Sequence, residues 1–214
     1  KQLGNPQKKV PPVIHVTGSN GKGSTCAFLQ SILEKNGYTV HKFISPALIF
    51  EGENYIVSGK EISDEQFYEY LMEVKKAYDE IQNNEDYLKD LKEADESDSS
   101  FHIDDPKHNG VLSWCFLVPM AILAFSKNKA DFTIIEVITG GLYDLTNIFT
   151  EKETVATVLT PMVMGDNHGF SLGNNIAEKA DQKARLCKPG VPIISSIQEP
   201  EAIDSIKKVA EEFG

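Results

Sequence analysis

Residues 13–25, with the sequence VIHVTGSNGKGST, constrain the fold of this chain more than any other stretch. They begin with β-branched residues suited to a buried strand and continue into a loop with three glycines around Lys22. Apolar residues then recur with helical spacing from Ala27 to Leu33. A strand, a glycine-rich loop and a helix in this order are typical of a phosphate-binding loop, in which backbone N–H groups at a helix N-terminus hold anionic oxygens.

The loop differs from the common pattern G-x-x-x-x-G-K-[ST], because only two residues separate Gly18 from Gly21 and a glycine follows Lys22 directly. A simpler interpretation is a tight glycine turn with an exposed lysine. Three glycines are more than such a turn needs, so we predict phosphate binding, with Lys22 on the outer phosphate groups. The predicted phosphate-binding residues are Gly18, Ser19, Asn20, Gly21, Lys22, Gly23, Ser24 and Thr25.

Strand-like and helix-like apolar patterns alternate along the rest of the chain. This alternation is typical of an α/β fold with a doubly wound, mostly parallel sheet. In such sheets ligands bind at the carboxyl ends of the strands, where the glycine-rich loop, Ser45, Glu136 and His168 are all expected. The predicted strands are residues 13–16, 38–44, 131–137, 154–159 and 191–195, and the predicted helices are residues 24–37, 63–78, 111–125, 176–186 and 200–213.

Three segments need separate interpretation. Residues 111–125 are apolar on all sides, so we predict a buried helix in which Pro119 causes a kink or a late start and Trp114 belongs to the core. Residues 47–60 are expected to form a loop and a short strand. Residues 82–110 are acidic and polar, and we predict a partly flexible insertion there. Its histidines, His102 and His108, fit a metal cluster or, preferably, a solvated surface.

Composition argues against several classes of protein. The formal net charge is −11 and Lys and Arg are not clustered, which is unlike a nucleic-acid-binding surface. No stretch has the roughly 18 to 20 apolar residues of a membrane span. Cys26, Cys115 and Cys187 lie far apart and predict neither a disulfide framework nor a zinc site. A reducing, cytoplasmic location fits these features, and an organelle fits them as well.

Four motifs occur in the order found in folylpolyglutamate synthase and dihydrofolate synthase: TGSNGKGST, ISPAL, EVITGGLYDLTN, and the run from DNHGFSLGNN to QKARLCKPGVP. The chain resembles this family, a branch of the Mur ligase superfamily, over nearly its whole length. The resemblance implies an ATP-dependent amide ligase that adds L-glutamate to a folate or dihydropteroate carboxylate through an acyl phosphate. ATP and Mg²⁺ are the implied cofactors, and we expect a monomer.

The resemblance also implies roles for single residues. Lys183 matches a lysine that the family carbamylates, and Asp144 and Asn147 match positions near the substrates. The implied magnesium ligands are Ser45, Glu136 and His168, and the implied catalytic residues are Lys22, His168 and Lys183. A hydroxyl, a carboxylate and an imidazole, completed by water and phosphate oxygens, suit a hard cation, although imidazole is less usual for magnesium.

Some features depart from the family pattern. The departing positions are Ala47, Cys115, Ile138, Leu142, Asn167 and Arg185. Family members also carry a second, Rossmann-like domain, so we expect residues 1–214 to be an incomplete Mur ligase-type ATP-binding domain. One alternative is a ligase-derived domain that has lost catalysis and serves as a nucleotide-binding or structural subunit. Another is a P-loop ATPase or kinase with a different substrate.

Overall fold

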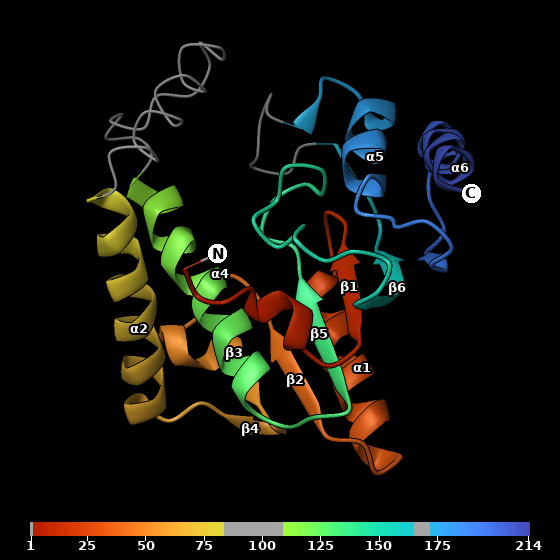
Figure 1. The fold of residues 1–214 in the computed structure, drawn as a ribbon. Helices are drawn as coiled ribbons and strands as arrows, with labels where there is room; N and C mark the ends of the chain where they lie inside the picture. Colours follow the sequence, from red (N-terminus) through yellow and green to blue (C-terminus); the bar gives the residue numbers. More distant parts are fainter. Residues whose placement is uncertain (1, 84–108, 165–171) are drawn as a thin grey trace.

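The computed structural model describes residues 2–83, 109–164 and 172–214 (Figure 1). They form a seven-stranded sheet in the order β4-β3-β2-β5-β1-β6-β7. The strands are β1 (Val13–Thr17), β2 (Val40–Phe43), β3 (Tyr55–Val57), β4 (Lys60–Glu61), β5 (Phe132–Glu136), β6 (Thr154–Leu159) and β7 (Ile193–Ser195). The helices are η1 (Pro6–Lys9), α1 (Lys22–Lys35), η2 (Glu51–Asn54), α2 (Asp64–Gln82), α4 (Asn109–Lys127), α5 (Ile176–Ala184) and α6 (Pro200–Phe213).

The predicted doubly wound α/β sheet is confirmed. β2, β5, β1, β6 and β7 pair in parallel, and β1 lies between β5 and β6. The antiparallel hairpin of β3 and β4 extends one edge, where only a loop and a single short strand were predicted. Strands of three and two residues are too short to show an alternating pattern, which is why the second one was missed.

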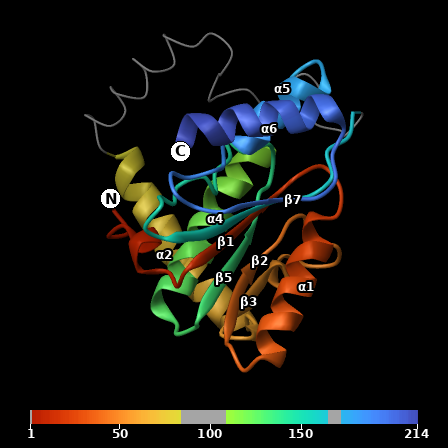
Figure 2. The same ribbon diagram turned by 90° about the vertical axis from the view of Figure 1, so that its right-hand side faces the viewer.

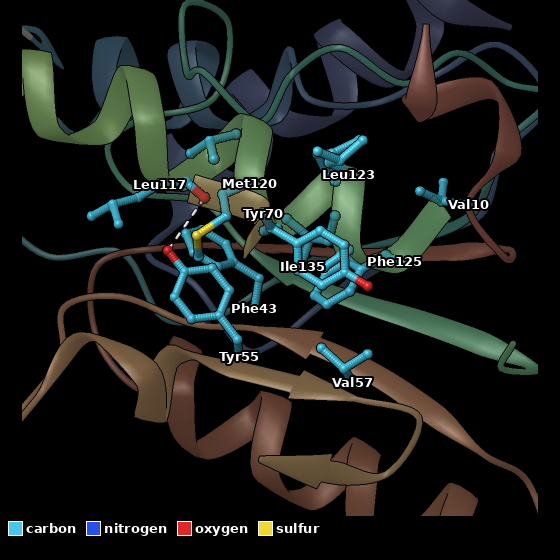
Figure 3. Close-up of a cluster of buried hydrophobic side chains, with 14 of the residues drawn as sticks. Val10, Phe43, Tyr55, Val57, Tyr70, Leu117, Met120, Leu123, Phe125 and Ile135 are labelled. Carbon is cyan, nitrogen blue, oxygen red and sulfur yellow. Dashed lines mark hydrogen bonds between the residues drawn. The ribbon is translucent and has the colours of Figure 1, made fainter. Parts of the chain in front are cut away.

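Helices cover both faces of the sheet. α1 packs on β1, β2 and β5 around a small cluster that includes Val16, Cys26 and Ile134. α2 and α4 cover the other face and enclose the main core, in which the Tyr55 hydroxyl donates a hydrogen bond to the Leu117 carbonyl (Figure 3). α5 and α6 pack together beside β6 and β7 (Figure 2).

α4 runs through Pro119, and its start ten residues before that proline shows that the predicted late start was wrong. An internal proline costs a helix about 3 kcal/mol. The residues that follow Pro119, from Met120 to Phe125, are all buried against α2 and the sheet, and their burial offsets that cost. Trp114 packs against the same core, as predicted.

α1 begins at Lys22, two residues before the predicted start. Its first turn therefore includes the second half of the glycine-rich motif. The apolar spacing predicted the helix correctly, but Leu29 and Leu33 pack on the sheet together with Cys26, whereas Phe28 and Ile32 are largely exposed. No helix in the described ranges is long and apolar enough to cross a membrane. The acidic segment at residues 84–108 and the turn at residues 165–171, with His168 and Asn167, lie outside the described residues.

Candidate nucleotide and metal site

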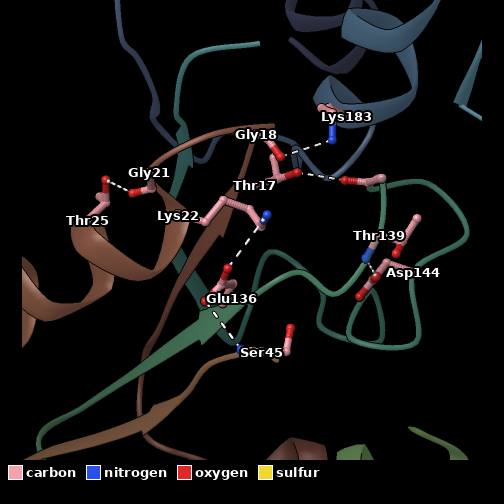
Figure 4. A network of polar contacts seen from close by, with 11 residues as sticks. Thr17, Gly18, Gly21, Lys22, Thr25, Ser45, Glu136, Thr139, Asp144 and Lys183 are labelled. Carbon is pink, nitrogen blue, oxygen red and sulfur yellow. Dashed lines mark hydrogen bonds and ion pairs between the residues drawn. The ribbon is translucent and has the colours of Figure 1, made fainter. Parts of the chain in front are cut away.

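The carboxyl ends of three neighbouring parallel strands meet at one edge of the sheet (Figure 4). The glycine-rich loop follows β1, Glu136 is the last residue of β5, and Ser45 lies two residues beyond β2. These groups line a cleft of about 540 Å³. The predicted meeting of the loop, Ser45 and Glu136 is therefore present, at the edge where ligands bind in α/β sheets.

Glu136 and Lys22 form an ion pair in this cleft. The Lys22 Nζ lies 3.6 Å from a carboxylate oxygen of Glu136. The residue Glu136 is only 3% exposed. The backbone N–H of Ser45 donates to the other oxygen at 3.3 Å. Burial raises the pKa of Glu136, and Lys22 and the Ser45 N–H oppose that rise. The pair thus holds a carboxylate in a site where an isolated charge would be costly.

Two glycines set the backbone of the loop. Gly18 has φ +143°, and a Cβ there would lie 1.9 Å from the Thr160 Oγ1, so no other residue fits without displacing β6 or its loop. Gly21 has φ +81° and precedes α1 directly. The N–H groups of Ser19 and Asn20 donate to the Pro161 carbonyl, each at 3.1 Å.

Two of the residues predicted to bind phosphate, Ser19 and Asn20, therefore have N–H groups that are already engaged within the protein. The Thr25 hydroxyl donates to the Gly21 carbonyl at 2.8 Å. The donors that suit an anion are the first N–H groups of α1, which have no carbonyl partner within the helix. Gly21, Lys22, Gly23 and Ser24 line the cleft, and they are the part of the predicted set best placed for phosphate.

Lys183 lies behind the loop, on α5, and is almost fully buried. Its Nζ donates to the Gly18 carbonyl at 3.0 Å. α5 also packs tightly on the turn after β5, because a Cβ at Gly141 would lie 2.7 Å from the carbonyl oxygens of Gln182 and Lys183. The structure thus brings Lys183, a predicted site residue, to the glycine-rich loop.

Asp144 is held by three donors within residues 139–149, the loop that follows β5. Its carboxylate accepts hydrogen bonds from the Thr139 N–H at 2.6 Å, the Thr146 N–H at 2.9 Å and the Thr146 hydroxyl at 2.5 Å. Burial raises the pKa of Asp144, and these hydrogen bonds oppose the rise. The Thr146 hydroxyl also contacts the Nε2 of His15 on β1 at 2.8 Å.

Asn147 is engaged within the protein as well. Its Nδ2 donates to the Leu142 carbonyl at 3.0 Å, and its Oδ1 accepts from the Lys188 Nζ at 2.5 Å. Sequence reasoning missed His15, Thr146 and Lys188. A histidine inside an apolar strand was the one available signal for a buried polar contact.

An apolar cavity of about 330 Å³ lies between the N-terminal segment, α2, α4 and the loop after β5. Trp114 and Cys115 on α4 line it, together with Leu145 and Ile148 from the loop and Leu3 from the N-terminal segment. Residues 139–149 therefore connect the polar cleft with the apolar cavity along the chain. The core prediction for Trp114 did not include this cavity.

Known proteins resemble this chain in sequence and fold. The dihydrofolate synthase/folylpolyglutamate synthase of Bacillus subtilis is 35% identical over 211 residues, which are 98% of this chain and 43% of that protein. A structure of an FPGS–AMPPCP complex is 28% identical, with a TM-score of 0.77, and matches 100% of this chain and 46% of its own. E. coli FolC in complex with DHPP and ADP is 27% identical, with a TM-score of 0.76, over 100% of this chain and 43% of its own.

The chain belongs to the folylpolyglutamate synthase and dihydrofolate synthase family. It spans less than half the length of these relatives. No family model matches the chain.

The cleft of this folylpolyglutamate synthase-type chain has oxygen-bearing side chains that suit magnesium. Mg²⁺ prefers oxygen ligands and is usually held by one or two carboxylates together with water and phosphate oxygens. The buried Glu136 carboxylate, with the Ser45 and Ser24 residues lining the same cleft, fits that requirement. Within the described ranges, this cleft included, no group of three or more His, Cys, Asp and Glu residues is placed to hold a metal ion.

Proposed function

We propose that this chain forms the ATP-binding part of a ligase that joins L-glutamate to a folate or dihydropteroate carboxylate. The observation that carries the proposal is the ion pair between the partly buried Lys22 and the buried Glu136, beside the N-terminus of α1. In this cleft, the Lys22 cation suits the phosphate groups of a nucleotide, and the Glu136 carboxylate suits the magnesium ion that accompanies them. The names of the relatives support the choice of reaction, as do the AMPPCP, ADP and DHPP in the related structures.

In the proposed reaction, the acceptor carboxylate attacks the γ-phosphorus of ATP and ADP leaves. The amine of L-glutamate then attacks the acyl phosphate, an amide forms, and phosphate and a proton leave. Lys22 moves from Glu136 to the outer phosphate groups, while the first N–H groups of α1 bind the inner ones. Glu136 and Ser45, with His168 as the predicted third ligand, would hold Mg²⁺, and the bound ion would supply positive charge to offset the negative charge of the phosphate groups.

Lys183 is proposed to be carbamylated. Reaction of its amine with carbon dioxide forms a carbamate and releases a proton, which adds an anionic oxygen ligand beside the phosphate loop. The carbamate nitrogen keeps one N–H, which is enough for the observed contact with the Gly18 carbonyl. Lys183 would then fix the loop and contribute a carboxylate-like group at the same time.

The apolar cavity is proposed to take the aromatic part of the acceptor. Its volume of about 330 Å³ is at the small end of ligand pockets. Trp114 supplies an aromatic surface for a planar ring. Asp144 and Asn147 lie on the loop that joins this cavity to the cleft, so the acceptor's carboxylate can point toward ATP. We further propose a monomer, located in the cytoplasm, with small-molecule substrates only.

Calorimetric titration with Mg–AMPPCP tests the nucleotide site, with Lys22→Ala and Glu136→Ala as variants and the exposed-site Lys76→Ala as the control. We expect binding that needs magnesium, that both site variants abolish and that the control retains. Glutamate ligation by the whole natural protein tests the reaction. Nucleotide binding without ligation would favour a domain that has lost catalysis, and no nucleotide binding by folded protein would contradict the proposal.

A further inference from the structure

The apolar cavity depends on the shape of one loop. Leu145 and Ile148 line it, and both are about 40% exposed, so little core packing fixes them. Their positions are set by the backbone of residues 139–149. Asp144 fixes that backbone, because its carboxylate joins the Thr139 N–H at the start of the loop to Thr146 in its second half. We call these contacts the Asp144 clasp.

The hydrogen bonds of Thr146 define the direction of a short chain of contacts. A hydroxyl has one proton, and here that proton is donated to Asp144 at 2.5 Å. The same oxygen must therefore accept the hydrogen bond from His15, whose Nε2 lies 2.8 Å away. It follows that the His15 ring carries a proton on Nε2. His15 therefore donates a hydrogen bond to Thr146, and Thr146 donates one to Asp144.

The surroundings of His15 favour this single state. The ring is fully buried and meets Phe149 edge-on, with 5.9 Å between the ring centroids. Burial, reinforced by the nearby charge of Lys188, lowers the pKa of His15 to about 3. The ring is therefore neutral at pH 7. Within the described residues its Nδ1 has no hydrogen-bond partner, which leaves the Nε2 contact as the polar function of this side chain.

We propose that His15 is a positioning residue for acceptor binding: acting through Thr146, it holds the Asp144 clasp and so sets the cavity wall made by Leu145 and Ile148. The inference rests on the proposed function, in which this cavity takes the aromatic part of the acceptor. His15 suits this role because it lies on β1, the strand that also carries the phosphate loop. It therefore ties the acceptor wall to the strand that places ATP.

Two pairs of variants test the role in the whole natural protein. His15→Leu removes the N–H donor, whereas His15→Gln offers an amide N–H near the Nε2 position. Thr146→Val removes the hydroxyl with little change of shape, whereas Thr146→Ser keeps it. Loss of one buried hydrogen bond should raise the acceptor KM about tenfold in His15→Leu and Thr146→Val. The KM for ATP and kcat should stay within about twofold, and the two conservative variants should recover most of the loss.

The double variant His15→Leu/Thr146→Val should be no worse than either single variant, because all three break the same series of contacts. Dihydropteroate binding, followed by calorimetric titration, provides a readout that does not depend on turnover. Mg–AMPPCP binding serves as the control for an intact phosphate loop.

The outcomes separate the inference from the proposed function. Unchanged acceptor affinity in His15→Leu and Thr146→Val, beside a parent protein that binds the acceptor, would overturn the inference alone. Equal losses of acceptor and nucleotide binding would show a general structural role and overturn it as well. A parent protein that binds Mg–AMPPCP but no dihydropteroate or folate would remove the proposed acceptor and the inference with it.

Discussion

Glu136 and Asp144 are both buried carboxylates near the carboxyl edge of the sheet, but their partners differ in kind. Glu136 has a cation, Lys22, at 3.6 Å and one backbone N–H at 3.3 Å. Asp144 has three neutral donors at 2.5 to 2.9 Å, all from its own loop. Burial raises the pKa of both groups.

The difference indicates which carboxylate can take part in ligand binding. The long, flexible Lys22 side chain can leave Glu136 when phosphate arrives, and a metal ion can then take its place. The donors of Asp144 belong to short backbone segments and cannot leave without unfolding the loop. Glu136 therefore suits an exchangeable ligand position, whereas Asp144 suits a scaffold, even though sequence resemblance places both near the substrates.

The largest effect is expected for Glu136→Gln, which keeps the shape but removes the charge. Ligation by the whole protein should fall about a hundredfold or more, as when a group that stabilises a transition state is lost. The free energy of unfolding without ligand should change by less than about 1 kcal/mol, because a costly buried charge and its partial compensation disappear together. Ligation rates and urea unfolding measure the two effects. Ligation within tenfold of the parent would contradict an exchangeable ligand role for Glu136.

Gly18→Ala tests whether the glycine-rich loop after β1 is fixed in position. Its Cβ would lie 1.9 Å from the Thr160 Oγ1, so we expect a loss of stability of more than about 3 kcal/mol and no nucleotide binding. Gly37→Ala is the matched control, since Gly37 also has a positive φ but nothing within 4 Å. It should lose only about 1 kcal/mol. Thermal unfolding of both variants decides the point, and similar losses would mean that contact with Thr160 is unimportant.

Asp144→Asn should destabilise the protein by about 2 kcal/mol, because an amide N–H₂ must face at least one backbone N–H. Mg–AMPPCP affinity should stay within about twofold if Asp144 is a scaffold. Asp181→Asn provides the comparison, because Asp181 pairs with Arg185 on a partly exposed helix surface. That change should cost less than about 1 kcal/mol. A large loss of nucleotide affinity in Asp144→Asn would contradict a purely scaffolding role for Asp144.

The smallest effect is a dependence of stability on pH. A carboxyl group with a raised pKa contributes stability that is complete below its ordinary pKa and is lost as the pH rises through the raised value. The ordinary values are 3.8 for Asp144 and 4.5 for Glu136. Relative to Glu136→Gln and Asp144→Asn, the parent protein should therefore lose stability as the pH rises above these ordinary values. Saturating Mg–AMPPCP should remove the Glu136 part only, as measured by urea unfolding.

Sequence predicted the parts of the site that depend on strand ends. The glycine-rich loop and Ser45 follow strands and Glu136 ends one, and parallel strands bring their carboxyl ends together whatever the details of packing. Lys183 was predicted through family resemblance alone. The contact of His15 with Thr146 could not be predicted, because it joins residues 131 positions apart whose sequence pattern shows only a polar residue in a strand.

Other misses have local physical causes. Pro119 suggested an interruption, but the burial of the residues around it keeps α4 helical. The N–H groups of Ser19 and Asn20 looked suited to phosphate, and the Pro161 carbonyl from the loop after β6 takes them instead. Such competition between partners depends on segments that are distant in sequence, and composition and spacing say nothing about it.

The strand order has a consequence for how this protein emerges from the ribosome. β1 is made before the other six strands of this sheet, yet both of its edges are paired late: Val13 with Thr133 on β5, and Ile14 with Ala156 on β6. At about 5 to 20 residues per second, the chain needs on the order of ten seconds to supply these partners. During that interval an apolar strand and the glycine-rich loop beside it have no sheet to join. Nascent chains that stall before β6 should be the form most in need of a chaperone.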